Sequence, residues 1–517
     1  MSEWLVVLMR SLLTRMGLAW LRRTSRQPRT VADMCAAQAR IRARLIAQLA
    51  PLPVGRARGL DRLPAGERQA EAFRAQVPFA DYSAYQGLID EVAQGRPDVL
   101  FPGRALALAI TSGTTSTGKA GERFIPQSRG LLDHHACGGA VALTRLADHA
   151  GAALQGGRML LMGGSTELKA NPHGIPAGDL SGIVVSRIPW LLRGSYEPGQ
   201  AIALMGNWEA KLAAMVERLD GRDLRLASGI GSWLLALFAA SCAKRGATRA
   251  SELWPHLQAV IHGGHAMEPL MPQFQHHLPA ATWMQEVYPA SEAFIAVGQA
   301  PWRLGEGRPA PLEVLADANV LIEFSPVDDP RPEACIGPEA LAAGRVYRVV
   351  VTTPGGLVRW LVGDQVRGEG PGLMRFAGRT AARISVFGEH VEGDLLVQAL
   401  AAACASTGAR IRHSHVAPVL PAPGAQRGAH EWLLQPEADS TVDAAALASV
   451  LDEYLRAHCA DYDAHRSVQL DPPLITVLPN GTFERWLAAN GKLGGQHKVP
   501  QAWNDRHHAE RILAARN

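Results

Sequence analysis

The stretch Thr111 to Lys119, which reads TSGTTSTGK, holds the densest group of residues that could do chemistry. Its glycines let backbone N–H groups converge on one point, and six hydroxyl side chains add further donors. Such a loop suits the oxygens of a polyphosphate. Because Ala105 to Ile110 reads as a buried strand, the loop follows a strand directly, which argues against an ordinary linker. The residues expected to hold phosphate are Ser112, Gly113, Thr114, Thr115 and Ser116.

The same stretch also has the G-x-x-x-x-G-K spacing of a Walker A loop, between Gly113 and Lys119. Two features argue against that interpretation. Ala120 stands where Walker A needs the hydroxyl that ligates magnesium, and Phe124-Ile125-Pro126 follows where Walker A must open a helix. A proline so close to the loop fits an extended segment better than a helix. The sequence therefore predicts strand–loop–strand, a hairpin lying over a nucleotide.

Thr-Ser-Gly-Thr-Thr followed by Phe-Ile-Pro resembles the phosphate loop of the plant auxin-inducible acyl acid amido synthetases and their bacterial relatives. These enzymes belong to the adenylate-forming superfamily, which includes firefly luciferase and acyl-CoA synthetases. The resemblance recurs in order along the chain. The matching segments begin with FRAQVP at Phe73, SGI at Ser228, HGG at His262, YPASE at Tyr288, TT at Thr352, VGD at Val362, GTF at Gly481 and QHKVP at Gln496.

The resemblance implies an enzyme that uses ATP and Mg²⁺ to activate a carboxylic acid. The acid would become an acyl-adenylate with release of pyrophosphate, and the acyl group would pass to an amine, most simply that of an amino acid. Glu292 would be the magnesium carboxylate, since Mg²⁺ typically uses one or two carboxylates plus phosphate oxygens. The adenine would lie against Tyr288, within the segment Tyr288, Pro289, Ala290 and Ser291.

Further roles follow for residues toward the C-terminus. Asp364 comes after an apolar run and a glycine, where an ionised carboxylate needs partners, and a ribose diol offers two donors. The resemblance implies the same ribose contact for Asp364. It also places Arg379 at a hinge beside the nucleotide, and Lys498 against the reacting carboxylate and α-phosphate. The residues expected near the acyl substrate are Trp233, His262, Gly263 and Gly264.

The chain departs from the family pattern at three positions, each of which loses a cation: Leu361, His390 and Gln501. Coenzyme A carries a 3′-phosphate and a diphosphate, so a site for it should gather cations. These losses therefore favour an amine acceptor, and they put the geometry of the second step in doubt. Two other interpretations stay open, an acyl- or aryl-CoA ligase and a catalytically idle nucleotide-binding protein.

The elements that must position these residues alternate between strands and helices, which indicates an α/β sheet covered on both faces. The predicted strands are 159–162, 259–261, 320–324 and 347–351, and the predicted helices are 30–50, 131–149, 200–219 and 230–245. We expect a large N-terminal adenylate-forming α/β domain at 1–378 and a smaller, mobile α+β domain at 379–517 that swivels between half-reactions. ATP and Mg²⁺ would bind between them.

The composition gives no sign of a nucleic-acid or obligate protein partner, so the expected partners are small molecules. The formal charge of +4 over 517 residues, with no basic stripe interleaved with aromatics, argues against nucleic-acid binding. Six cysteines stand far apart without a C-x-x-C pair, so a disulfide framework or zinc ribbon is not expected and a reducing cytoplasm is the simplest compartment. The histidine pairs at 134–135, 262–265 and 413–415 lack further ligands at matching spacing. Nothing indicates an obligate protein partner.

The N-terminus is apolar but is interrupted by Arg10 and Arg15, and no cleavage site follows. Its apolar residues recur at helical spacing and predict an amphipathic helix: Leu5, Leu8, Leu12, Leu13 and Met16. Packing on the core is the favoured interpretation, and contact with a membrane surface is the alternative. No stretch approaches the ~20 apolar residues of a membrane span, so stable membrane insertion is not expected.

Overall fold

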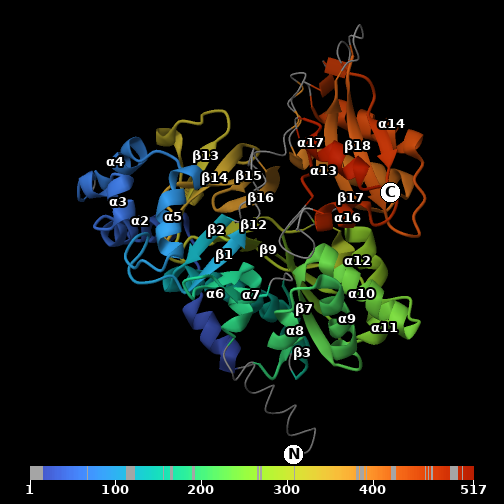
Figure 1. Ribbon diagram of the computed structural model, residues 1–517, viewed down its shortest axis with the longest axis horizontal. Helices are drawn as coiled ribbons and strands as arrows, with labels where there is room; N and C mark the ends of the chain where they lie inside the picture. The colour runs from blue at the N-terminus through green and yellow to red at the C-terminus, as the bar shows by residue number, and fades with distance from the viewer. Residues whose placement is uncertain are drawn as a thin grey trace, which may run out of the picture.

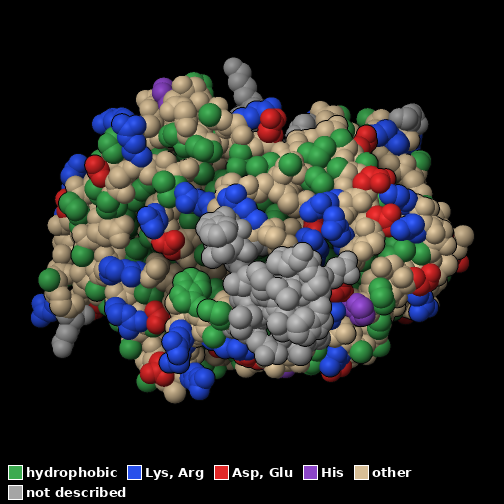
Figure 2. Space-filling view, turned by 90° about the horizontal axis from the view of Figure 1, so that it is seen from below, with side chains coloured by type: hydrophobic (Ala, Val, Ile, Leu, Met, Phe, Trp, Pro, Cys, Tyr) green, Lys and Arg blue, Asp and Glu red, His purple; other side chains and the backbone are tan. Residues whose placement is uncertain are grey.

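The computed structural model shows a broad sheet-based body and a smaller domain at the C-terminal end of the chain (Figure 1). Basic and acidic side chains are interspersed over the face seen in Figure 2, as the small net charge predicts. None of the described helices is long and apolar enough to cross a membrane. The structure describes residues 16–516 except 67, 112–122, 155, 164–166, 189–192, 265–266, 268–269, 308, 380–383, 385–388, 390, 392, 421–426, 460–461, 464, 467–469, 490–498 and 504.

A mixed sheet of 12 described strands runs through the larger body. Its strand order is β13-β14-β15-β16-β12-β10-β9-β8-β7-β3-β6, with β11 paired to β9. The strands β6, β3, β7, β8 and β9 pair in parallel, and the remaining pairs are antiparallel. Their bounds are β3 Arg158–Met162, β6 Tyr196–Glu197, β7 Leu224–Ile230, β8 Ala259–Gly263, β9 Trp283–Pro289, β10 Phe294–Gly298, β11 Trp302–Arg303, β12 Leu312–Val314, β13 Leu321–Pro326, β14 Val346–Thr352, β15 Trp360–Gly370 and β16 Leu373–Arg379.

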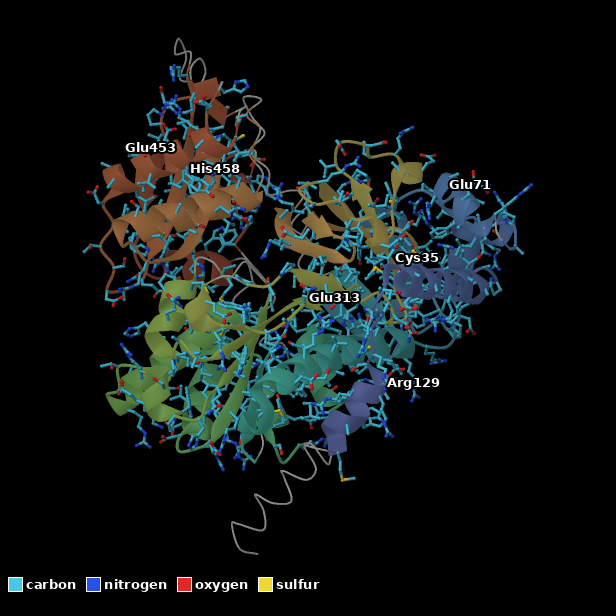
Figure 3. The ribbon with its side chains drawn as sticks, turned by 180° about the vertical axis from the view of Figure 1, so that it is seen from behind. Cys35, Glu71, Arg129, Glu313, Glu453 and His458 are labelled. Atoms are coloured by element: carbon cyan, nitrogen blue, oxygen red, sulfur yellow. The ribbon has the colours of Figure 1, made fainter. Side chains whose placement is uncertain are left out.

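Helices cover both faces of the parallel strands, because successive residues of a strand point to opposite faces. On β8, Val260 packs with α9 (Trp208–Leu219), α10 (Gly231–Arg245) and α12 (Met271–His277). Its neighbours Ala259 and Ile261 pack with α6 (Arg129–Ala150) on the other face. The predicted α/β sheet with helices on both faces is therefore confirmed. Arg145 of α6 also pairs with Glu313 of β12, labelled in Figure 3, and ties that helix to the sheet.

The antiparallel strands are covered by N-terminal helices, which share one apolar core with them. The predicted helix at 30–50 is α2 (Val31–Leu49), and Thr30 caps it by accepting a hydrogen bond from the Asp33 N–H at 3.1 Å. Three shorter helices follow before the first hairpin. They are α3 (Pro53–Ala57), α4 (Gln69–Gln76) and α5 (Gln86–Ala93).

The predicted single helix at 200–219 is wrong, because the structure divides it. α8 covers only Gln200–Ala203, and α9 starts anew at Trp208. The cause is Asn207, whose side-chain oxygen accepts from the Ala210 N–H at 2.8 Å. Asparagine is a strong N-cap residue, so it begins a helix more readily than it continues one. Other long helices match their predictions, among them α6 and α10.

The strands that the sequence predicts on either side of the glycine- and hydroxyl-rich stretch are confirmed, and residues 112–122 between them lie outside the described part. β1 (Ala107–Thr111) pairs antiparallel with β2 (Arg123–Gln127), with Ala107 opposite Gln127 and Thr111 opposite Arg123. The next helix, α6, begins only after β2 and is capped by Ser128, which accepts from the Leu131 N–H at 3.1 Å. A Walker A loop would lead straight into its helix, so that interpretation is excluded. β5 (Pro176–Gly178) and β4 (Lys169–Ala170) extend this small sheet.

The C-terminal part forms an α+β unit with cores of its own. Its sheet has the order β17-β18-β19, with β19 parallel to β18. Glu453 and His458 on α14 are labelled in Figure 3, and the His458 ring stacks on Tyr454 at 4.0 Å. Gln273 of α12 donates to Glu437 at 3.1 Å and joins the unit to the larger body. The bounds are α13 Gly393–Thr407, β17 Ile411–Val419, β18 Ala429–Pro436, α14 Ala444–His458, β19 Leu474–Val477, α16 Thr482–Ala489 and α17 His507–Ala514.

His134 of α6 is a buried core residue that makes the free energy of unfolding depend on pH. Its Nε2 accepts from the Phe294 N–H at 2.9 Å, and its Nδ1 contacts the Ala318 carbonyl. Burial lowers the pKa of His134 to about 4. The unfolded chain takes up this proton near pH 6.5, so lowering the pH from there toward 4 reduces the free energy of unfolding. We expect a loss of about 2 kcal/mol from this residue at about pH 5.

Urea denaturation at several pH values tests this expectation. His134→Gln should show a weaker fall in unfolding free energy between neutral pH and about pH 5 than the unmodified protein. His173→Gln, which changes an exposed histidine, should keep the original pH dependence. The same pH dependence in all three proteins would contradict the assignment.

Candidate active site

The predicted substrate residues meet at one edge of the sheet, where the parallel strands end. Gly263 closes β8 and lies in register between Ile230 of β7 and Val287 of β9. Only glycine fits there, since a Cβ on Gly263 would stand 2.3 Å from the Val287 carbonyl oxygen. Tyr288 follows Val287 at the same edge. Ligands of α/β sheets commonly bind outside the carboxyl ends of the strands, so this edge is the candidate site.

A buried hydrogen bond joins two residues that the sequence assigns to the nucleotide. The Tyr288 hydroxyl donates to Asp364 Oδ2 at 2.6 Å, and the two residues are only 8% and 4% exposed. The Tyr288 ring meets Phe376 of β16 edge-on, with centroids 5.6 Å apart. Arg379 stands directly opposite Asp364 in the β15–β16 pair. Strands β9, β15 and β16 thus bring these three positions together, although the Arg379 side chain lies outside the described part.

The turn between β9 and β10 holds the rest of the YPASE segment. It closes with a hydrogen bond from the Ala290 N–H to the Ala293 carbonyl at 2.8 Å. The buried Ser291 carbonyl accepts from Gln127 Nε2 at 3.1 Å, and Gln127 is the last residue of β2. The base of the predicted phosphate hairpin is therefore tied to the turn that carries Glu292. Glu292 itself is half-buried.

The predicted acyl-site residues lie at or near the same edge. α10 begins at Gly231, directly after β7 ends, so Trp233 belongs to the first turn of the helix at that edge. Its half-buried ring packs on Trp208 with centroids 5.3 Å apart. His262 is buried, and its ring faces Trp302 edge-on at 6.4 Å. Gly264 follows Gly263 with a φ of +92°.

Several predicted residues lie outside the described part of the chain. These are Ser112, Gly113, Thr114, Thr115, Ser116 and Lys498. The residues just after Lys498 are described and are held on β17. The Val416 N–H donates to the Gln501 carbonyl at 2.9 Å, and His415 Nδ1 contacts the Pro500 carbonyl at 2.6 Å. Burial lowers the pKa of His415 to about 4, so His415 is neutral near pH 7 and donates there as an uncharged ring.

Sequence reasoning missed what Arg359 does. Its guanidinium is fully buried and donates to the carbonyls of Arg74, Val77 and Pro332, each at 2.8 Å, and to Glu323 Oε2 at 3.2 Å. The FRAQVP segment is therefore held from inside by Arg359. The signal in the sequence is that FRAQVP and the segment Arg359 to Leu361 both correspond to parts of the family pattern. The position is structural, and it supports the start of β15, which carries Asp364.

Glu389 is a second residue whose role the sequence did not show. It stood in the family pattern beside the lost cation at His390, and the structure buries it completely. His430 Nε2 lies 2.8 Å from Glu389 Oε1, and the Cys459 thiol donates to the Glu389 carbonyl at 3.4 Å. Glu389 is thereby fastened to the C-terminal unit, immediately after the segment where the sequence predicts the hinge.

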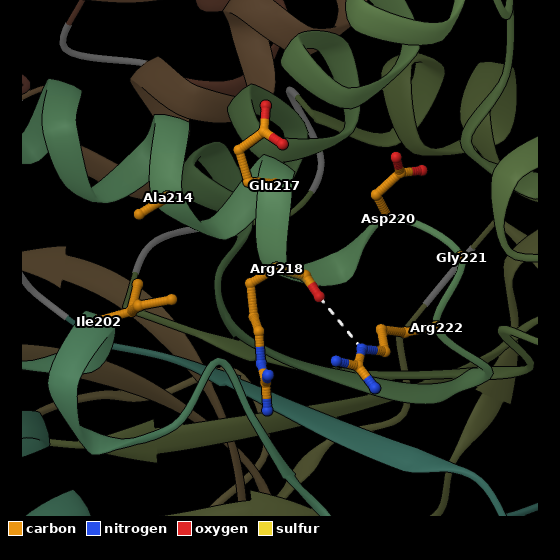
Figure 4. Close-up of a pocket in the computed structure, with 7 residues that line it drawn as sticks. All are labelled: Ile202, Ala214, Glu217, Arg218, Asp220, Gly221 and Arg222. Carbon is orange, nitrogen blue, oxygen red and sulfur yellow. Dashed lines mark hydrogen bonds between the residues drawn. The ribbon is translucent and has the colours of Figure 1, made fainter.

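An open hollow on the outer side of α9 contains none of the predicted site residues (Figure 4). The Arg222 Nε donates to the Arg218 carbonyl at 3.3 Å across it. The acidic groups of its lining are already neutralised, since Glu217 pairs with Lys244 at 2.7 Å and Asp220 pairs with Arg245 at 2.6 Å. The hollow therefore presents mixed, internally paired charge and is not the candidate site.

The family models for the GH3 N-terminal, central and C-terminal domains match residues 32–216, 313–376 and 394–507. The chain belongs to the GH3 family. No curated protein sequence matches it.

Two solved structures show the same fold along nearly the whole chain. The GH3.15 acyl acid amido synthetase is 16% identical, covers 93% of both chains and has a TM-score of 0.72. A 2-hydroxyisobutyryl-CoA ligase, solved in its postadenylation state with 2-HIB-AMP, is 13% identical, covers 94% of both chains and has a TM-score of 0.57. At such low sequence identity, these two comparisons show a shared fold and nothing about the activity of this chain.

Proposed function

We propose that the protein is an ATP-dependent acyl acid amido synthetase. It activates a carboxylic acid as its acyl-adenylate, releases pyrophosphate, and transfers the acyl group to an amine, such as the α-amino group of an amino acid. The observation that supports this best is the buried Tyr288–Asp364 pair at the strand ends, in a chain of the GH3 family. The solved relatives point the same way, since one is described as an acyl acid amido synthetase and another holds an acyl-adenylate.

The nucleotide would lie along the edge formed by β8, β9 and β15. Asp364 would accept from the ribose hydroxyls, and Tyr288 would hold both the adenine and the Asp364 carboxylate. The loop at 112–116 would donate to the phosphates. Glu292, on the turn tied to the hairpin base, fits Mg²⁺, which typically takes one or two protein carboxylates together with phosphate oxygens. When bound, Mg²⁺ would neutralise charge on the phosphates.

The chemistry has two steps. In the first, an oxygen of the acid attacks the α-phosphorus, the bond to pyrophosphate breaks, and Lys498 stabilises the charge that develops. In the second, the amine nitrogen attacks the acyl carbon, the bond to AMP breaks, and the amine loses a proton. The mixed anhydride is already reactive, so the second step needs mainly placement of the amine. We assign 1–378 to the adenylation domain and 379–517 to a domain that swivels between the steps.

The proposed setting is the cytoplasm of a bacterium. All six cysteines are free thiols, which agrees with a reducing compartment. The activity is tested by pyrophosphate release over a panel of carboxylic acids. Release that depends on one acid is expected, whereas ATP binding without release for any acid would identify an idle nucleotide-binding protein.

Asp364→Ala should weaken ATP binding about 10- to 150-fold, the range for losing hydrogen bonds to a charged group. Tyr288→Phe keeps the ring but frees the Asp364 carboxylate from its 2.6 Å hydrogen bond, so a smaller loss of roughly tenfold is expected. Calorimetry with a non-hydrolysable ATP analogue measures both. Asp328→Ala, which changes an exposed aspartate paired with Arg345, is the control and should bind normally. Unchanged affinity in Asp364→Ala would rule out the ribose assignment.

A further inference from the structure

Helix 16–24, the dark blue helix beneath α6 in Figure 1, presents two different faces. One face docks on the body of the protein. Leu18 is buried in the core that α6 forms with the sheet, Ser25 is buried just after the helix end, and Arg22 Nε donates to Asp148 at 2.9 Å. The opposite face is exposed. There Met16 is 63% exposed and Trp20 64%, one turn apart.

Met16 and Trp20 end an apolar pattern in the sequence, whose earlier members lie outside the described residues. Leu5, Leu8, Leu12, Met16 and Trp20 recur at spacings of three or four residues. This is the spacing that places side chains on one side of a helix. The favoured prediction for this pattern is packing on the core. Leu5, Leu8, Leu12 and Leu13 lie outside the described residues, and Met16, the described member, is exposed. Two large apolar side chains exposed one turn apart form a contiguous apolar patch, and such patches mark contact surfaces more often than single exposed residues do.

The positive charge of the same segment indicates which kind of partner would bind this face. Six arginines and one acidic residue give the first 30 residues a formal charge of +5, which exceeds the +4 of the whole chain. Arg23, Arg26 and Arg29, which follow Trp20 in the sequence, are all exposed. A second copy of this chain would bring like charges together across such a face. An apolar face containing tryptophan and flanked by arginines instead suits an anionic lipid surface, where the indole lies at the headgroup level.

We propose that the exposed face of helix 16–24, with the arginines that follow it, binds the protein peripherally to anionic membranes. Trp20 and Met16 would enter the headgroup boundary, and the arginines would meet lipid phosphates. The body stays outside the bilayer, so the active-site edge remains accessible to acid, ATP and amine. Figure 2 looks onto the side from which this helix projects, where apolar side chains stand among Lys and Arg side chains. The proposal concerns location and is independent of the reaction.

Co-sedimentation of the full chain with vesicles tests the proposal. Vesicles of phosphatidylcholine with about one-third phosphatidylglycerol should bind the protein, and high salt should weaken that binding. Vesicles of phosphatidylcholine alone should bind little. Arg23→Gln/Arg26→Gln should lower the partition constant roughly 30-fold, about fivefold for each arginine. Met16→Ser/Trp20→Ser should lower it at least tenfold.

Two control variants test whether vesicle binding depends on this surface, and not on exposed apolar residues or positive charge elsewhere on the protein. Leu474→Ser/Val477→Ser changes two apolar residues, 46% and 43% exposed, on β19, and should bind vesicles normally. Arg62→Gln/Arg249→Gln removes two exposed arginines elsewhere and should lose little. All four variants should keep acid-dependent pyrophosphate exchange. No binding to anionic vesicles, equal binding to neutral ones, or a wild-type dimer that Met16→Ser/Trp20→Ser converts to monomer would each overturn the proposal.

Discussion

Arg359→Met is expected to lower the free energy of unfolding by about 3–5 kcal/mol, the cost of removing one partner from a buried ion pair. Methionine fills much of the volume but replaces none of the bonds. Glu323, 5% exposed, would lose its guanidinium partner, and three carbonyl groups would lose donors at 2.8 Å. The Arg359 guanidinium also lies over the Phe79 ring, 4.8 Å from its centroid. Urea denaturation measures the loss.

Two further variants test whether the loss of stability comes from the buried ion pair. Arg345→Met removes an exposed arginine paired with Asp328, and surface pairs contribute about 0–1 kcal/mol, so little change is expected. Adding Glu323→Gln to Arg359→Met removes the stranded carboxylate and should restore part of the stability. A loss below about 1 kcal/mol in Arg359→Met would show that the buried network does not hold the FRAQVP segment.

Lys498→Ala is expected to slow acid-dependent ATP–pyrophosphate exchange by about 10²–10³-fold, by analogy with removing one donor to developing charge. ATP affinity should be unchanged, because an interaction made only in the transition state lowers the rate and not ground-state binding. A supplied acyl-adenylate should still be converted at close to the normal rate, since the C-terminal domain would by then have turned away.

The nearest control is Lys492→Ala, which removes a lysine from the same segment and should leave exchange intact. Loss of both half-reactions to the same extent in Lys498→Ala would instead identify a structural lysine. The described residues after Lys498 are anchored to the C-terminal sheet, because Gln501 and Trp503 are hydrogen-bonded to Val416 of β17.

Local chemistry explains why much of the fold could be predicted. Pro126, three residues into β2, made a helix after the phosphate loop untenable, and the hairpin is present. The strands at 259–263 and 346–352 are short apolar runs between breakers, and such runs identify strands buried on both faces. The predicted helix at 200–219 is divided for an equally local reason, because Asn207 caps a new helix through its hydrogen bond from the Ala210 N–H.

Individual site residues could be predicted from the sequence, but the contacts between them could not. Tyr288 and Asp364 were each assigned to the nucleotide, yet their direct hydrogen bond joins strands that are not neighbours in the sheet. No spacing rule connects positions so far apart in sequence. The burial of Arg359 and Glu389 was hidden for the same reason, since both read as polar residues in a motif until their partners Glu323 and His430 are seen. A charged residue in a motif does not by itself show whether that residue binds a ligand or stabilises the fold.

The central claim is that this chain joins an acid to an amine through an acyl-adenylate. The most direct measurement incubates the protein with ATP, Mg²⁺, the acid that supports pyrophosphate release, and either a pool of amino acids or coenzyme A. Mass spectrometry then identifies the products. The account predicts an amide with an amino acid, AMP and pyrophosphate, and no thioester. A thioester with coenzyme A and no amide from any amine would contradict it and identify an acyl-CoA ligase.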